Sequence, residues 1–395
     1  MKRSFVIDVG SSKVSFLDAS AEGGALIINS FDTRPYAGYS IGKLPDAEAV
    51  LEAVDELLSK AYSRSVLRSH SICIGVPAPF ILSAVTSREV HTPSGRVCDS
   101  DLELLLDRGE NIEPPEGYTL MHTTPFDYAV NALPCGGGSP LGLKSKRLSA
   151  KFCHAFVCGE FVSLLTDAVE SAGWSVGNFI SSPMACASFT IPLNARLGGA
   201  VLIDCGGTHC DVSAIRGNAV VRTESFGIGG THFAKDIAYG FELPMQEAEE
   251  LKRGYRFGGD AALAAAKDLN ADDLRLIVES RAEEFADRLR EALDAVSSES
   301  PAGSPVHLVG GGVSGMSGCI EYLSEKTGRS IIAGAPRAGR LNGIRHSPTL
   351  ALAHFMLYDG GMPEKSALSA RSTDRIFSGV KEFFSVSAFS RKHKI

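Results

Sequence analysis

The sequence predicts an α/β protein with two lobes of related design and a small α+β subdomain inserted into the first lobe. An apolar strand, an Asp, a turn of small residues and a second apolar strand occur first around Asp8 and Gly10, and again around Asp204 and Gly206. A third apolar strand ends in a glycine turn at residues 310–312. Repetition of one unit at long period indicates an internal duplication, although the two segments share little sequence identity.

The first lobe opens with a predicted hairpin at residues 4–18, where two apolar runs flank Gly10-Ser11-Ser12. Residues 45–62 are predicted to form an amphipathic helix that starts near Pro45, because their apolar side chains recur at helical spacing. The short apolar run at residues 71–76 predicts a buried strand.

The stretch from residue 80 to about residue 165 has a different character. Short strand-like segments surround a loop-rich part that contains Pro114-Pro115 and the glycine-rich residues 135–140. Residues 150–158 are then typical of a strand and residues 161–172 of a helix. We therefore predict a small inserted α+β subdomain.

In the second lobe, residues 199–215 repeat the strand–turn–strand pattern, and residues 305–316 predict a strand that runs into the third glycine turn. Residues 273–296 keep a 3.6-residue apolar period and predict a long helix. The predicted organisation is a first lobe at 1–79 and 166–200 to which 340–358 returns, an inserted subdomain at 80–165, a second lobe at 201–339, a linker at 359–373 and a tail at 374–395.

Composition excludes several classes of protein. The chain has 395 residues, of which 44% are hydrophobic and 22% charged, and its net charge of −7 gives no indication of a nucleic-acid partner. The nine cysteines are scattered and mostly lie in apolar runs, without the paired spacing of a zinc site. Lys2 and Arg3 precede an apolar run too short for a signal peptide, and no segment approaches the ~20 apolar residues that span a bilayer. These features favour a reduced cytoplasmic protein with peripheral membrane contact at most.

The three small-residue turns predict a nucleotide site. Such a site needs backbone N–H groups that point at phosphates, small residues that let the chain approach, and carboxylates near a metal ion. Two facing hairpins with Asp in this position would clamp a phosphate chain, and the third turn would form a floor for base and ribose. The predicted ligands of ATP are Asp8, Gly10, Ser11, Ser12, Lys13, Asp204, Gly206, Gly207, Thr208, Gly310, Gly311 and Gly312. Asp8 and Asp204 are predicted to hold Mg²⁺ through water.

Each turn taken alone has a simpler interpretation, because a glycine after a strand often marks only a turn and an Asp there often caps it. The order and separation of the three turns favour the nucleotide site. The sequence lacks the GxxxxGK[ST] pattern of a P-loop and the GxGxxG pattern of a Rossmann fold.

These turns resemble those of the superfamily of actin, sugar kinases and DnaK chaperones, and the whole chain resembles the FtsA family of bacterial cell-division proteins. Four features carry the second resemblance: residues 5–14, the placement of the insertion between residue 76 and residues 180–188, the segment 226–252, and the linker with its terminal amphipathic helix. The resemblance implies a two-lobed actin-like ATPase fold with duplicated ribonuclease-H-like lobes. It also implies at most a slow ATPase that polymerises at the membrane and binds FtsZ through about residues 225–300, with the inserted subdomain contacting other division proteins.

The second turn departs from the family pattern of three glycines followed by Thr, because Thr208 replaces the last glycine and His209 the usual Thr. Thr208 adopts a positive φ less readily than glycine does. We interpret His209 as a surface turn residue rather than a donor to phosphate. We expect this departure to affect the rate of ATP hydrolysis more than the binding of nucleotide.

The tail combines apolar and basic character. Ile376, Phe377, Val380, Phe383 and Phe384 fall within one arc of a helix at residues 374–389. Residues 371–395 carry six Lys or Arg against two acidic residues, so the tail has a charge of +4 and the rest of the chain −11. This pattern predicts a helix that binds an anionic lipid surface. The resemblance to FtsA implies that this surface is the inner face of the cell membrane at the division site. The alternative is a helix that packs back on the body.

Three other functions remain open at this stage. A PilM-like actin-fold scaffold shares the insertion but normally lacks such a tail. A nucleotide-locked pseudo-ATPase would bind ATP without turnover. A sugar or acetate kinase would need a catalytic Asp in a substrate cleft, and the sequence offers no convincing candidate.

Overall fold

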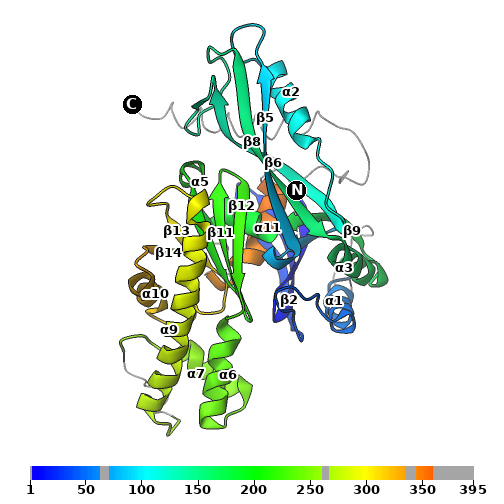
Figure 1. The fold of residues 1–395 in the computed structure, drawn as a ribbon. Coiled ribbons are helices and arrows are strands. Elements are labelled where there is room, and N and C mark those ends of the chain that lie inside the picture. Colours follow the sequence, from blue (N-terminus) through cyan, green and yellow to red (C-terminus); the bar gives the residue numbers. More distant parts are fainter. Residues whose placement is uncertain (1, 63–70, 260–266, 335–343, 359–395) are drawn as a thin grey trace.

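The computed structural model describes residues 2–62, 71–259, 267–334 and 344–358 of the chain. The strands of the first lobe are β1 (Arg3–Val9), β2 (Lys13–Glu22), β3 (Ala25–Pro35), β4 (Ser71–Val76) and β9 (Ser175–Ser181). Those of the second lobe are β10 (Ala200–Cys205), β11 (Cys210–Arg216), β12 (Ala219–Phe226), β13 (Val306–Val309) and β14 (Ile331–Ala333). Figure 1 shows the two lobes side by side, with the inserted subdomain above them.

The two five-stranded sheets have the same topology. Their orders are β3-β2-β1-β4-β9 and β12-β11-β10-β13-β14. In each sheet the first three strands form an antiparallel meander, and two parallel strands extend it from the first strand. Asp8 lies opposite Ser15 and Asp204 opposite Asp211, in each case one pair before the ladder ends. Each lobe thus contains a mixed five-stranded sheet, and the predicted duplication is confirmed.

In each lobe the sequence predicted a two-stranded hairpin, and the structure adds a third antiparallel strand, β3 or β12. β3 follows β2 through Gly23 and Gly24, both of which have positive φ, as a tight turn requires. The residues of β3 are mostly half-buried or exposed, so this edge strand carries a weaker apolar pattern than β1 and β2 do. The third strand of each meander is consequently harder to predict than the first two.

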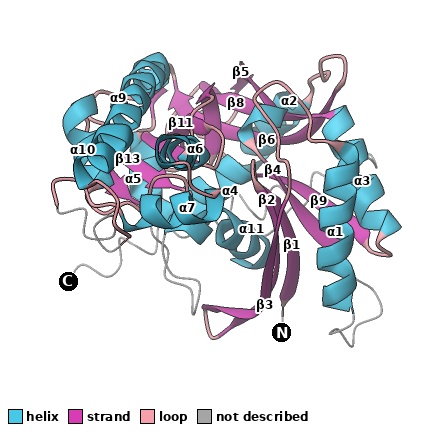
Figure 2. Ribbon diagram, turned by 90° about the horizontal axis from the view of Figure 1, so that it is seen from below, coloured by secondary structure: helices cyan, strands magenta, loops and turns pink. Residues whose placement is uncertain are grey.

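Helices cover both faces of the first sheet. On one face lie α1 (Ala47–Tyr62) and α3 (Gly159–Ser171), where Val54, Leu58 and Phe161 are buried. On the other lie α4 (Ser182–Thr190) and α11 (Ser347–Tyr358), as Figure 2 shows. The α4–α11 layer also contacts the second sheet, because its core contains Leu202 and Val309 beside Leu350. A single hydrophobic layer around α4 and α11 thus joins the two lobes, and we call this region the base.

The second lobe is covered by α6 (Gly230–Phe241), α7 (Met245–Gly254), α9 (Ala271–Val296) and α10 (Cys319–Thr327). The long predicted helix is confirmed as α9, which begins two residues before the predicted start. Asn270 caps it by accepting the N–H groups of Asp272 and Asp273. Its apolar face, including Phe285 and Leu289, is buried against the sheet.

The insertion has its own sheet and core. Its strands are β5 (Ile81–His91), β6 (Tyr118–Val130), β7 (Leu133–Pro134) and β8 (Arg147–Cys158), in the order β5-β8-β6-β7, and its helix is α2 (Asp99–Glu110). Gly109 of α2 sits so close to Phe152 that an added Cβ would lie 2.1 Å from the ring. The residue-165 boundary falls inside α3, whose buried side chains belong to the core of the first lobe.

Smaller helical segments complete the described chain: η1 (Ala78–Phe80), α5 (Leu193–Gly198), η2 (Ser297–Glu299) and η3 (Ile344–His346). None of the helices within the described ranges is both long and apolar enough to cross a membrane. The predicted linker and tail, with Ile376, Phe377, Val380, Phe383 and Phe384, lie outside the described residues.

Candidate functional site

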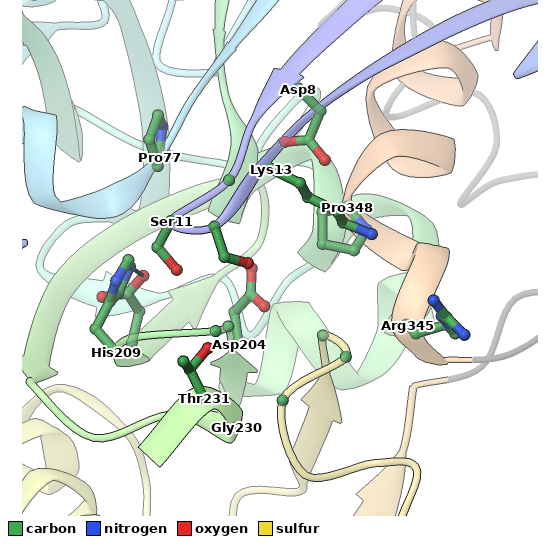
Figure 3. Close-up of a pocket in the computed structure, with 18 of the residues that line it drawn as sticks. Asp8, Ser11, Lys13, Pro77, Asp204, His209, Gly230, Thr231, Arg345 and Pro348 are labelled. Carbon is green, nitrogen blue, oxygen red and sulfur yellow. Dashed lines mark ion pairs between the residues drawn. The ribbon is translucent and has the colours of Figure 1, made fainter. Parts of the chain in front are cut away.

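The three predicted turns meet at one cavity of about 730 Å³ between the lobes. Asp8 and the first turn approach from β1 and β2, and Asp204 and the second turn from β10 and β11. The third turn follows β13, because Val309 pairs with Asp204 in the parallel ladder and Gly310 comes next. Every predicted nucleotide ligand except Thr208 lines this cavity (Figure 3).

The second and third turns pack so closely that their glycines leave no room for side chains. An added Cβ on Gly312 would lie 2.2 Å from the carbonyl oxygen of Gly206. Gly310 has a φ of +90°, and its Cβ would lie 2.5 Å from Oδ1 of Asp204. The N–H of Gly312 donates to the carbonyl of Cys205 over 2.8 Å. These contacts fix the third turn against the strand that carries Asp204.

The first turn of α6 completes this arrangement. The N–H groups of Gly230 and Thr231 donate to the carbonyls of Gly206 and Gly207, at 3.1 and 2.7 Å. Both residues line the cavity, as does Lys252, whose buried Nζ donates to the carbonyl of Gly230 over 3.2 Å. The predictions omitted these residues, although they lie in segment 226–252, which carried the family resemblance.

The electrostatics of the cavity centre on two carboxylates. Asp8 accepts a 2.7 Å hydrogen bond from the hydroxyl of Thr349, at the start of α11. Burial raises the pKa of Asp8, while the Thr349 hydrogen bond and the charge of Lys13 lower it in part. The pKa of Asp204 is raised to about 7 by burial and by the negative charges of Asp211 and Asp8. A cation between the two carboxylates would relieve this unfavourable electrostatic state.

The environment fits a hydrated divalent cation better than a fully protein-ligated one. Within the described residues, no group of three or more His, Cys, Asp or Glu side chains is arranged to hold a metal ion. Mg²⁺ is commonly bound through one or two carboxylates, with waters and phosphate oxygens as its other ligands. Asp8 and Asp204 would hold it in that way, and the ion would supply positive charge beside the phosphates.

The first turn contacts the second directly. The N–H of Thr208 donates to Oγ of Ser11 over 3.1 Å, and the Thr208 hydroxyl donates to the carbonyl of Tyr39 over 3.2 Å. Thr208 has no positive φ, so the strain expected from the loss of a glycine is absent at this residue.

The prediction that His209 lies at the surface is wrong. It is not a surface turn residue: only 4% of it is exposed, and it lines the cavity. Its Nε2 lies 3.3 Å from Oδ2 of Asp211, and the ring of Tyr39 packs on it with centroids 5.2 Å apart. The local sequence gave no sign of this burial, because Tyr39 comes from the other lobe.

Comparison with known proteins confirms the fold. PilM, in the PilM–PilN type IV pilus biogenesis complex, superposes with a TM-score of 0.57 at 18% identity, over 89% of this chain and 97% of that one. The ethanolamine utilization protein EutJ of Carboxydothermus hydrogenoformans gives a TM-score of 0.54 at 15% identity, over 90% of each chain. Two lobes of matching topology around a central cleft therefore define an actin-like ATPase fold.

Sequence comparison finds similarity to one group of proteins. Residues 201–354 match the family described as Cell division protein FtsA. The FtsA of Escherichia coli K12 is 24% identical over 248 residues, which cover 62% of this chain and 59% of that protein. The FtsA of Agrobacterium fabrum is 25% identical over 334 residues, or 80% and 73%. The chain is similar to FtsA over these residues, in agreement with the resemblance of its motifs, and it spans less than two thirds of the Escherichia coli protein that it matches.

Proposed function

We propose that this chain is an ATP-binding, actin-like division protein that polymerises on the inner face of the cell membrane and tethers FtsZ filaments to it. The observation that carries the proposal is the single cavity at which Asp8, Asp204 and three small-residue turns meet. The sequence similarity of the chain to FtsA supports the division role. The membrane role rests on the tail sequence alone.

Each part of the cavity has a distinct task in this proposal. The first two turns, at residues 10–13 and 206–207, would receive phosphates, because small residues there let the backbone approach a charged ligand. Asp8 and Asp204 would face the hydrated Mg²⁺. The third turn would lie under the ribose and base, where Gly311 is so close to Arg345 that an added Cβ would lie 3.2 Å from the Cβ of Arg345.

Calorimetric titration with Mg·ATP tests the nucleotide site. Gly311→Trp is expected to abolish binding, because the indole would not fit between the third turn and Arg345, both of which line the cavity. Gly227→Trp is the matched control, since Gly227 is exposed in the second lobe and a Cβ there meets nothing within 4 Å. Equal ATP affinity of Gly311→Trp and the unsubstituted protein would show that the assignment is wrong.

Co-sedimentation with anionic vesicles tests the membrane role. The full chain with ATP is expected to pellet with vesicles, and the chain lacking residues 374–395 to stay in solution. Replacing both Phe383 and Phe384 with Asp should have the same effect, since burial of each Phe contributes about 1.5–3 kcal/mol. Added salt should weaken binding only in part, because it screens the Lys and Arg contribution and leaves the apolar one.

The relation to FtsA also suggests that the second lobe carries the FtsZ contact, within about residues 225–300. The protein should therefore recruit purified FtsZ filaments to vesicles, and only when its tail is present. A PilM-like scaffold is the alternative: PilM shares the fold, but the sequence similarity to FtsA supports the division role better. Absence of vesicle binding and of FtsZ binding at every protein concentration would favour that alternative. ATP binding without turnover would indicate a nucleotide-locked scaffold.

A further inference from the structure

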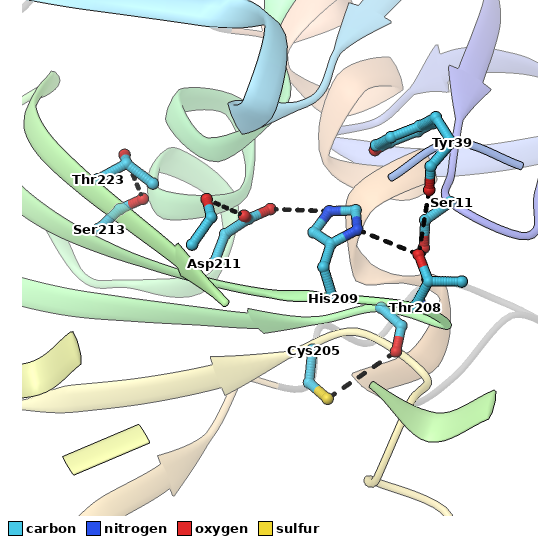
Figure 4. A network of polar contacts seen from close by, with 10 residues as sticks. Ser11, Tyr39, Cys205, Thr208, His209, Asp211, Ser213 and Thr223 are labelled. Carbon is cyan, nitrogen blue, oxygen red and sulfur yellow. Dashed lines mark hydrogen bonds and ion pairs between the residues drawn. The ribbon is translucent and has the colours of Figure 1, made fainter. Parts of the chain in front are cut away.

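One polar network runs from the second sheet to the first lobe along the wall of the cavity (Figure 4). Ser225 on β12 donates a 2.5 Å hydrogen bond to Oδ1 of Asp211 on β11. The other oxygen of Asp211 faces Nε2 of His209 at 3.3 Å. On the far side of the ring, Nδ1 of His209 lies 3.4 Å from Oγ1 of Thr208, whose hydroxyl reaches the carbonyl of Tyr39.

The protons of this network can be assigned from its acceptors. A carbonyl oxygen only accepts hydrogen bonds, so the single proton of the Thr208 hydroxyl goes to Tyr39. Oγ1 of Thr208 is then left as an acceptor for Nδ1–H of His209, while Nε2–H of the same ring faces the carboxylate of Asp211. A ring that donates from both nitrogens is an imidazolium. The geometry therefore favours a positive charge on His209.

The surroundings of His209 support this protonation state. The titratable groups near it are Asp211 on β11, Asp204 on β10 and Tyr39 in the segment before α1. Burial acts to lower the pKa of His209, but the hydrogen bond and charge of Asp211 and the charge of Asp204 outweigh it, so the pKa is raised. Burial raises the pKa of Tyr39 well above its ordinary value, so that ring is neutral.

A positive charge on His209 would add to the donors of the second turn, because several turn N–H groups are already bonded within the protein. Gly10, Gly206 and Thr208 each donate to a protein acceptor in the two facing turns. Lys13 is the cation of the first turn, but burial lowers its pKa. The second turn carries Asp204 and, at its end, His209, both of which line the cavity.

We propose that His209, held by Asp211, is a phosphate-recognition residue that provides the second turn with a positive charge. This inference rests on the proposed nucleotide binding and assigns a role to the residue that departs from the family pattern. Asp211 is then a positioning residue: it orients the ring and stabilises its charge, and Ser225 orients Asp211.

The test compares ligands that differ in phosphate charge. Calorimetry with Mg·ATP, Mg·ADP and adenosine at pH 7 would be run on the unsubstituted protein and on His209→Gln. The Gln amide retains a donor toward Asp211 but has no charge. Affinity for ATP is expected to fall about tenfold, equivalent to about 1.4 kcal/mol, with a smaller loss for ADP and none for adenosine.

Two companion variants separate charge from fold. Asp211→Asn should reduce ATP affinity similarly and lower the pKa of His209, measured from its ring proton resonance by NMR. Ser213→Ala is the matched control, because the buried Ser213 hydroxyl bonds Thr223 in the same sheet and does not line the cavity. It should leave the affinities for all three ligands unchanged.

Three results would overturn the inference while leaving nucleotide binding intact: unchanged ATP affinity in a folded His209→Gln protein, an equal loss for adenosine, or a His209 still neutral at pH 6.5 in the unsubstituted protein. The NMR titration needs no variant, so it decides the charge even if His209→Gln does not fold. Failure of the unsubstituted protein to bind any of the three ligands would instead refute the proposed nucleotide site, and this inference with it.

Discussion

Asp204→Asn is expected to stabilise the protein without ligand while weakening its binding of Mg·ATP. The amide keeps the shape of the carboxylate and removes its charge. The folded protein raises the pKa of Asp204 to about 7, whereas an unfolded Asp titrates near about 4. Because the folded-state pKa is the higher one, the unsubstituted protein loses stability as pH rises from about 4 to about 7, and the Asn variant does not.

The size of the effect follows from the shift. Three pKa units correspond to about 4 kcal/mol, and solvent in the cleft reduces this figure, so the gain at pH 8 should be about 2–4 kcal/mol. The carboxylate of Asp204 has no hydrogen-bond partner among the described residues, so the substitution should break no hydrogen bond there. The gain should vanish at pH 4, where both proteins are neutral at this position.

The assay is a thermal or urea unfolding series at pH 4, 6 and 8 without nucleotide, beside a titration with ATP in the presence and absence of Mg²⁺. Equal stability of the two proteins at pH 8 would refute the electrostatic argument. A loss of stability at every pH, with Mg²⁺ dependence retained, would show instead that Asp204 caps its turn.

Three further substitutions probe other parts of the structure. Gly310→Ala should destabilise the fold by more than about 2 kcal/mol in urea unfolding, since its Cβ would lie 2.4 Å from the carbonyl of Cys205. The control Gly24→Ala is also at positive φ but lies in open space, so it should cost only about 1 kcal/mol. Equal costs would contradict the steric argument. Thr349→Val removes the hydrogen bond that lowers the pKa of Asp8, so the pH at which ATP binding becomes dependent on Mg²⁺ should rise. Thr349→Ser should restore the original pH profile. An unchanged profile in Thr349→Val would show that Asp8 does not bind the metal. Gly109→Ala should lower the melting temperature by placing a Cβ 2.1 Å from the Phe152 ring, and Phe152→Leu should partly restore it; no rescue would mean that the strain lies elsewhere.

The parts of this fold that the sequence predicted share a local origin. The hairpins around Asp8 and Asp204 are visible because each strand is buried and strongly apolar, and because the turn between them consists of small residues. The long helix α9 was equally clear, since its buried face repeats over 26 residues. Such features depend on neighbours within one element, which a sequence displays directly.

The features that escaped prediction depend on residues far apart in the chain. Thr349 is 341 positions from Asp8, and no local pattern connects the two. His209 resembles an exposed turn residue in the sequence, but Tyr39 of the first lobe, 170 positions away, packs on its ring. The hydrogen bond from Thr208 to Ser11 likewise joins turns 197 positions apart. A motif therefore located the cavity, while tertiary contacts determine its charge.

The two lobes are joined very differently at their base and at their turns. At the base, α4 and α11 bury apolar residues of both sheets in one continuous core, and separating them would expose that surface to water. At the turns, Thr208 makes two hydrogen bonds to the first lobe, to Ser11 and Tyr39, each of which contributes about 0.5–1.5 kcal/mol. Opening at the turns therefore costs far less than separation at the base. A ligand that bridges both turns would add its binding energy at a place where few contacts of the protein itself join the two lobes, so we expect bound nucleotide, more than the protein core, to set how firmly the cleft closes.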